Sequence, residues 1–250
     1  MIRSSVGAIL LLLTPTLAAA QQGTVYYDVS YDMARTIPDE FRDMPGMEDM
    51  IALMEKIQMT PTRMVLQFNE TASLLGLDQS YMDSLMAALD PSGMAQNIVS
   101  GGNMGTGQTY VDYEAGTYVM EAPGMLEKFL ITDDLDEVSW SISEEERLIL
   151  GYRTLKATAS HDTLTSEVWF APEIPVASSG LLQVAGPPGL VLAGNTYYGE
   201  SQQLVSFEAK RVELATSPEF APVFQKPTGG KVVSRGEYEE MARAMMKRLQ

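Results

Sequence analysis

Short stretches of alternating residues, separated by turn signals, are the feature that most constrains the fold of this chain. Apolar and polar residues alternate over residues 23–31 and 62–69, and again in one stretch after another from residue 107 to residue 214. A period of two places successive side chains on opposite faces, as in a half-buried β-strand. No long helical pattern separates the later stretches, so they favour one antiparallel sheet system over a series of βαβ units.

Two segments have helical spacing instead. The C-terminal residues 237–249 predict an amphipathic helix, and residues 38–58 predict a helix with one apolar face. A chain of 250 residues with 45% hydrophobic content has room for a sizeable core. Methionines recur along the apolar face of the earlier helix: Met44, Met47, Met50 and Met54.

Charge and composition exclude several classes of function. With 17 basic and 33 acidic residues the net charge is −16, which opposes binding to nucleic acid phosphates. The chain has no cysteine, so disulfides, thiolate catalysis, zinc ribbons and iron–sulfur clusters are excluded, and it has a single histidine. It contains no nucleophile elbow, zincin motif, P-loop or Rossmann fingerprint. The sequence therefore predicts a protein that is not an enzyme and holds no cofactor.

The first twenty residues predict a secretory signal peptide. Arg3 supplies a positive start, residues 6–13 are apolar, and small residues precede a cleavage site near Ala20. Pro15 interrupts the apolar run, which is too short to span the hydrocarbon of a bilayer. We therefore expect a periplasmic or secreted protein without a transmembrane segment in its mature chain.

Four segments in order carry a family resemblance. They read VSW at 138–140, ILGYRTLKA at 149–157, VWFAPEIP at 168–175 and GPPGLVL at 186–192. Their order and spacing resemble the GLPGLI family of secreted Gram-negative proteins. The resemblance implies an extracytoplasmic, mostly β protein and implies no reaction. At the level of fold, the segments are also similar to periplasmic proteins with a curved half-barrel sheet, such as lipoprotein carriers.

The proline-rich segments have a structural and a functional interpretation. Proline cannot donate to a strand ladder, and Gly189 can take conformations closed to other residues, so the segments suit a crossover that shapes the sheet. The same crossover could form the lip of a site for an apolar ligand, together with the methionine helix. The candidate ligand-binding residues are Trp169, Pro175, Pro188, Gly189, Met47 and Met50.

The methionine cluster allows three interpretations. Methionine fills irregular gaps in a core, so a helix packed on the sheet is the simplest. Exposed thioethers could form an adaptable apolar groove. They are also soft ligands for Cu(I), and the candidate metal residues are Met47, Met50 and Met54.

Acidic residues and the histidine give weaker signals. The run from Asp133 to Glu137 indicates a solvated loop, with Ca²⁺ binding as the alternative. Residues 144–146, three consecutive glutamates, predict a hairpin turn. His161 and Asp162 predict a tight, exposed turn between two strands. A pair of carboxylates for glycoside hydrolysis is the least favoured interpretation.

These observations combine into one hypothesis. We expect an α+β, mainly β fold with a curved, half-barrel-like antiparallel sheet, covered by the methionine-rich helix and followed by a C-terminal amphipathic helix. The expected divisions are a signal peptide at 1–20, one β-rich domain at 21–216 and a C-terminal segment at 217–250. The expected function is an exported, non-enzymatic envelope protein that binds an apolar ligand or a protein partner. A periplasmic Cu(I)-binding protein is the alternative, and a carboxylate-based hydrolase is third.

Overall fold

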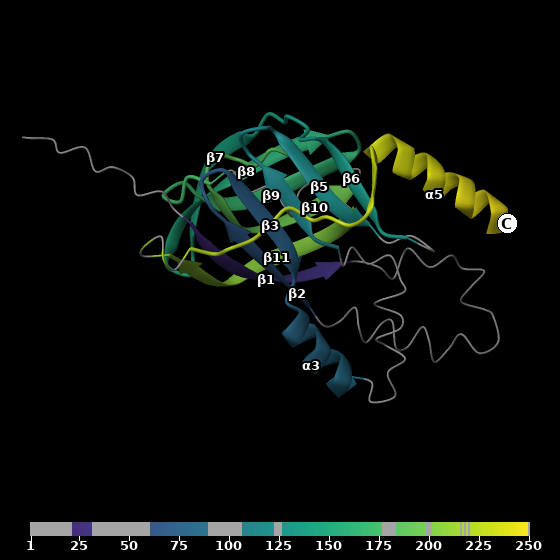
Figure 1. Cartoon of the computed structure of the whole chain (residues 1–250). Helices are drawn as coiled ribbons and strands as arrows, with labels where there is room; N and C mark the ends of the chain where they lie inside the picture. Colours follow the sequence, from purple (N-terminus) through teal and green to yellow (C-terminus); the bar gives the residue numbers. More distant parts are fainter. Residues whose placement is uncertain are drawn as a thin grey trace, which may run out of the picture.

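A computed structural model describes residues 22–31, 61–89, 107–122, 127–176, 184–198, 202–215, 217, 219 and 221–249. Their main elements are twelve strands and two helices, α3 and α5 (Figure 1). The strands are β1 (Gly23–Tyr31), β2 (Thr62–Phe68), β3 (Ala72–Leu77), β4 (Thr109–Asp112), β5 (Thr117–Ala122), β6 (Phe129–Asp134), β7 (Ser141–Ile149), β8 (Tyr152–His161), β9 (Leu164–Ala171), β10 (Leu190–Tyr198), β11 (Gln202–Leu214) and β12 (Lys231–Val233). The helices are α3 (Gln79–Leu89) and α5 (Arg235–Leu249).

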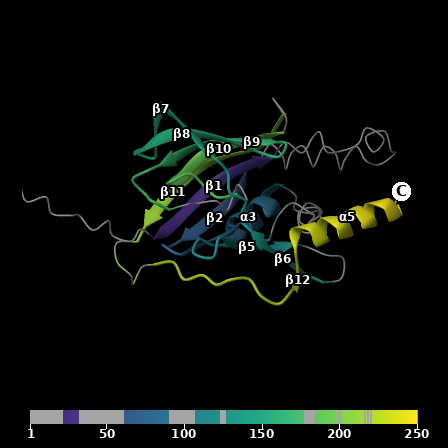
Figure 2. The ribbon, with the colours of Figure 1, turned by 90° about the horizontal axis from the view of Figure 1, so that it is seen from above.

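All twelve strands belong to one open sheet in the order β12-β6-β5-β4-β3-β2-β1-β11-β10-β9-β8-β7. The prediction of a mainly β fold is confirmed. The prediction of a purely antiparallel sheet is wrong. The sheet is mixed, because β12 pairs with β6 in parallel. Figure 2 shows the sheet curved so that β8, β9 and β10 lie across from β2 and β5. One hydrophobic core accordingly joins residues of both halves, including Leu66 of β2 and Phe170 of β9.

The inner face of the curved sheet carries the core. Along β1, Val25, Tyr27 and Val29 are fully buried while the residues between them are not, which matches the alternation in the sequence. The Tyr27 hydroxyl donates a 2.6 Å hydrogen bond to the carbonyl of Val191, at a point where the pairing of β10 with β9 shifts register. A side chain from β1 thus satisfies a carbonyl at an irregularity two strands away.

The strand pattern differs from the sequence prediction in three places. Residues 144–146 lie inside the edge strand β7, and the turn comes later, at Leu150 and Gly151, where both φ angles are positive. The alternation from Leu148 to Ala159, which predicts one strand of a hairpin, is therefore divided between β7 and β8. The structure also adds β3, in a region for which no strand was predicted. The predicted hairpin around His161 is confirmed as β8 and β9.

Both helices begin at capping residues. The Asp78 carboxylate accepts a hydrogen bond from the Tyr81 backbone N–H at the start of α3. At the start of α5, Ser234 and Glu237 form a reciprocal capping box, and the Ser234 backbone N–H holds the pKa of Glu237 below its usual range. The predicted C-terminal helix therefore starts at Arg235. The predicted helix at 38–58 lies outside the described residues, as does the predicted signal peptide. None of the helices described is long and apolar enough to cross a membrane.

Candidate functional site

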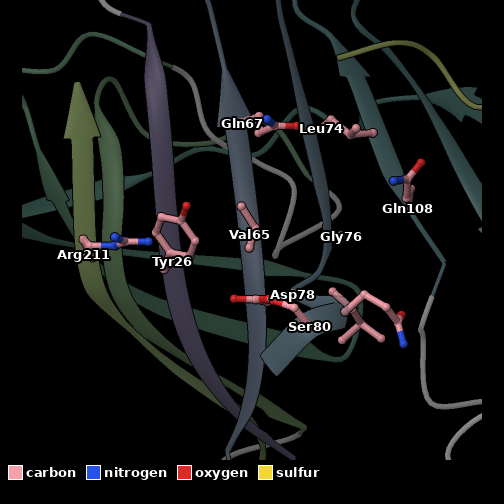
Figure 3. A pocket seen from close by; sticks show the side chains of 11 residues that line it. Tyr26, Val65, Gln67, Leu74, Gly76, Asp78, Ser80, Gln108 and Arg211 are labelled. Carbon is pink, nitrogen blue, oxygen red and sulfur yellow. The ribbon is translucent and has the colours of Figure 1, made fainter. Parts of the chain in front are cut away.

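A groove on the outer face of the sheet is a candidate binding site in the described part of the chain. Its volume is about 490 Å³ (Figure 3), within the usual range for ligand pockets. Its floor follows a row of residues paired across neighbouring strands: Arg211 with Tyr26, Tyr26 with Val65, and Val65 with Gly76. The row ends at Gln108, which precedes β4. Since strands are spaced by about 4.8 Å, these five positions extend over about 19 Å.

The groove combines a flat floor with polar walls. Val65, Leu74 and Gly76 supply the floor, and Gln67 and Gln108 stand on it. A Cβ added at Gly76 would lie 3.4 Å from the Gln108 side chain, so this side chain packs closely over the glycine. Each glutamine amide offers both a donor and an acceptor. The groove can therefore pair with a ligand that carries both kinds of group.

The charged groups of the groove have partners within the protein. The Arg211 guanidinium stacks 3.9 Å from the centroid of the Tyr26 ring and pairs with Glu213 at 2.9 Å. The Asp78 carboxylate caps α3 and accepts the Ser80 hydroxyl at 2.9 Å. Asp78 is the one carboxylate among the described residues that line the groove, so these residues do not supply the pair of carboxylates that glycoside hydrolysis needs.

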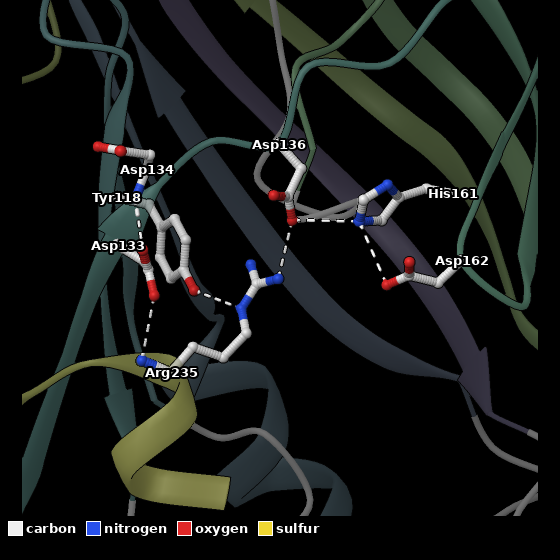
Figure 4. Close-up of polar contacts among 7 residues, drawn as sticks. All are labelled: Tyr118, Asp133, Asp134, Asp136, His161, Asp162 and Arg235. Atoms are coloured by element: carbon white, nitrogen blue, oxygen red, sulfur yellow. Dashed lines mark hydrogen bonds and ion pairs between the residues drawn. The ribbon is translucent and has the colours of Figure 1, made fainter.

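A second polar arrangement surrounds Arg235 at the start of α5 (Figure 4). Its guanidinium donates to the Tyr118 hydroxyl and to the Asp136 carboxylate, each at 2.8 Å, and its backbone N–H donates to Asp133 at 3.2 Å. His161 Nε2 lies 3.2 Å from the same Asp136 oxygen and 3.5 Å from an Asp162 oxygen. The cluster thus brings together α5, the end of β6, the segment after β6 and the turn between β8 and β9.

The chemistry of this cluster suits a structural role, in which it holds distant parts of the sheet together, better than it suits catalysis. Burial raises the pKa of Tyr118 despite the opposing hydrogen bond from Arg235. Burial works against the charge of Arg235, but the hydrogen bonds to Tyr118 and Asp136 outweigh it and raise the pKa of Arg235. The adjoining cavity is about 60 Å³, on the order of two water molecules. The arrangement joins two distant parts of the sheet and leaves little room for a substrate.

The predicted acidic loop and turn are only partly as expected. Asp133 and Asp134 are exposed at the end of β6, as predicted for a solvated segment. Asp136 and His161 are each about one-third exposed and contact each other, so the predicted exposed turn takes part in a long-range contact. Within the described ranges, no group of three or more His, Cys, Asp or Glu residues is arranged to hold a metal ion.

The predicted ligand-binding residues that the structure describes are not among those that line the groove. Trp169 is on β9, where the Arg147 guanidinium lies 4.5 Å from its ring. Pro175 and Pro188 are exposed, and Gly189 is buried. A Cβ at Gly189 would lie 2.5 Å from the Ala171 carbonyl oxygen, which is the close backbone approach expected of a structural crossover. Met47, Met50 and Met54 lie outside the described residues.

Sequence reasoning did not find the groove residues. Tyr26, Val65, Gln67 and Arg211 occupy outward positions of predicted strands, and a search for polar and aromatic side chains at those positions would have identified three of them. Grouping these residues into one site also requires the pairing of the strands, which cannot be predicted from any local sequence pattern.

The comparisons with known proteins concern the fold. No family model and no curated protein matches the chain. The chain is similar to a solved structure of PNGF-II in the C2 space group, with 15% identity, a TM-score of 0.50, and coverage of 89% of this chain and 32% of that one. A second PNGF-II structure, in the P21 space group, matches with 17% identity, a TM-score of 0.47, and coverage of 89% and 33%. This chain therefore spans about a third of the length of those structures, and the first likeness supports the fold alone.

Proposed function

We propose that this chain is an exported, non-enzymatic envelope protein whose ligand or protein partner occupies the outer-face groove. The observation that carries the proposal is the groove itself, which is about 490 Å³ and built on five neighbouring segments of one sheet. A site on paired strands is held rigidly, so little ordering free energy is lost on binding. Asp78, the one carboxylate among the described lining residues, already caps a helix, which favours binding over hydrolysis.

Export and family membership are parts of the same proposal and rest on sequence. The first twenty residues resemble a signal peptide, and the VWFAPEIP and GPPGLVL segments resemble the GLPGLI family. The polar lining of the groove changes the expected ligand from an apolar molecule to one with hydrogen-bonding groups. The Cu(I) alternative depends on Met47, Met50 and Met54, so the groove does not support it.

The proposal can be tested by nuclear magnetic resonance titration of the labelled protein without residues 1–20. The side-chain amide signals of Gln67 and Gln108, assigned with Gln→Glu variants, report on the groove. Three probes are added separately: a random-sequence decapeptide mixture without acidic residues, a mixture of neutral oligosaccharides, and palmitate. We expect at least one probe to shift both glutamine signals in a saturable manner. If all three leave both signals unchanged at millimolar concentration, the groove is not a binding site of this kind.

A further inference from the structure

The chain already holds one extended segment of its own against the outer face. Residues 221–230, here called the strap, run from the region after β11 towards β12 across that face (Figures 1 and 2). Pro222 and Pro227 favour an extended backbone, because proline fixes φ near −65°. Pro227 is buried although the segment belongs to no helix or strand.

Side-chain contacts fix the path of the strap. The Phe224 ring lies 6.4 Å from the ring of Tyr110 on β4. At the far end, a Cβ added at Gly230 would lie 2.9 Å from Leu130 on β6. Val119 lies between them on the outer face, paired with Tyr110, and is only 4% exposed. The outer face therefore buries apolar side chains beneath an extended polypeptide segment that runs across its strands.

The groove continues this binding surface. Leu74, which lines the groove, pairs directly with Tyr110, so the contact of Phe224 with Tyr110 is one strand away from the groove. The row from Arg211 to Gln108 also runs across the strands, and its two glutamine amides can donate to peptide carbonyls and accept from peptide N–H groups. The groove thus offers polar groups for a peptide backbone within a volume of about 490 Å³.

The net charge of the chain further limits the class of peptide that the groove can bind. The net charge of the chain is −16, which attracts basic segments and repels acidic ones. We infer that the groove binds an extended, neutral or basic peptide segment of a protein partner, laid across the strands beside the strap. This inference rests on the proposed function and narrows it to one class of ligand.

The same titration distinguishes this inference from the general proposal. If the non-acidic decapeptides bind and shift Gln67 and Gln108, the inference is supported. A matched mixture with glutamate in place of lysine should bind at least tenfold more weakly, because the chain is acidic. Binding of only oligosaccharides or palmitate would overturn the peptide assignment and leave the groove as a binding site. If no probe binds, both the proposed binding function and the peptide inference are wrong.

Variants then locate the peptide. Gly76→Leu fills the floor and should weaken peptide binding by tenfold or more. Gln108→Leu keeps a similar volume but removes one amide, and should weaken binding about tenfold, the equivalent of one hydrogen bond of about 1.4 kcal/mol. Gln203→Leu, at an exposed position of β11 outside the groove, is the matched control and should not change Kd. If Gly76→Leu fails to fold, Gln108→Leu decides alone. Peptide binding that both groove variants leave unchanged would overturn the site.

Discussion

Arg235 and Asp136 lie 99 residues apart, and their side chains meet at 2.8 Å where α5 reaches the segment after β6. The same carboxylate oxygen lies 3.2 Å from His161 at the end of β8. The backbone N–H of Ala185 also donates to the carbonyl of Asp136. These contacts fasten the parallel edge of the open sheet to its opposite end. The two ends of the curved sheet are therefore joined by a small polar cluster as well as by the core.

We expect Arg235→Met to lower the free energy of unfolding by about 1 kcal/mol. The substitution keeps most of the aliphatic contact but removes the hydrogen bonds to Tyr118 and Asp136. The loss is modest because both charged side chains are about one-third exposed. Urea denaturation measures it. Lys210→Met, which breaks an exposed pair with Glu208, is the control and should change stability by less than about 0.5 kcal/mol. Equal effects of both variants would contradict the fastening role.

Tyr27→Phe should destabilise the protein by about 1–3 kcal/mol. The variant leaves the Val191 carbonyl without the 2.6 Å hydrogen bond from the Tyr27 hydroxyl, inside the core. Tyr113→Phe is the matched control, because the buried Tyr113 hydroxyl interacts with the Ser73 side chain and satisfies no backbone carbonyl in the described structure. It should destabilise the protein less than Tyr27→Phe does. Midpoints of urea unfolding, with unchanged slopes, check both values. A Tyr27→Phe variant as stable as the parent would show that the bond to Val191 adds nothing.

The inner face of the sheet could be predicted from sequence because burial there leaves a local pattern. Val25, Tyr27 and Val29 alternate with less buried residues, so β1 was found with its bounds and its core face. β3 was not found, because Ala72 to Leu75 are all buried and show no alternation. Leu74 points to the outer face but is only 7% exposed, and its pairing partner Tyr110 lies under the strap.

The groove could not be predicted because its residues belong together only through strand pairing. Tyr26 and Arg211 are opposite each other because β1 and β11 pair in one register, which shifts at the very next position, between Tyr26 and Tyr27. A shift of one residue would turn these side chains to the other face. Such a register is set by the whole sheet. The edge strand β7 shows the same limit, since its glutamates lie in an irregular part of the pairing with β8.

Stability should fall steeply as the pH rises above 10. Burial raises the pKa of Tyr113 to about 12 and raises the pKa of Tyr27 further. Between pH 10 and these values the unfolded chain releases protons that the folded chain keeps, so each such tyrosine costs up to about 1.4 kcal/mol per pH unit. Urea unfolding at pH 9, 10 and 11 measures the slope. In Tyr113→Phe the slope should be shallower by about 1 kcal/mol per unit. An identical slope would mean that Tyr113 titrates normally when folded.

The turn between β7 and β8 offers a stabilising substitution. Leu150 and Gly151 have φ angles of 53° and 86°, as in a type I′ hairpin turn, and a leucine is strained there. Leu150 is 47% exposed, so little core contact is lost on replacing it. Leu150→Asn should raise the free energy of unfolding by about 1 kcal/mol, because asparagine adopts positive φ more readily. Leu148→Asn, at a 74% exposed position within β7, is the control and should not stabilise the protein. Thermal and urea unfolding measure both variants, and a Leu150→Asn variant no more stable than Leu148→Asn would show that the leucine is not strained in this turn.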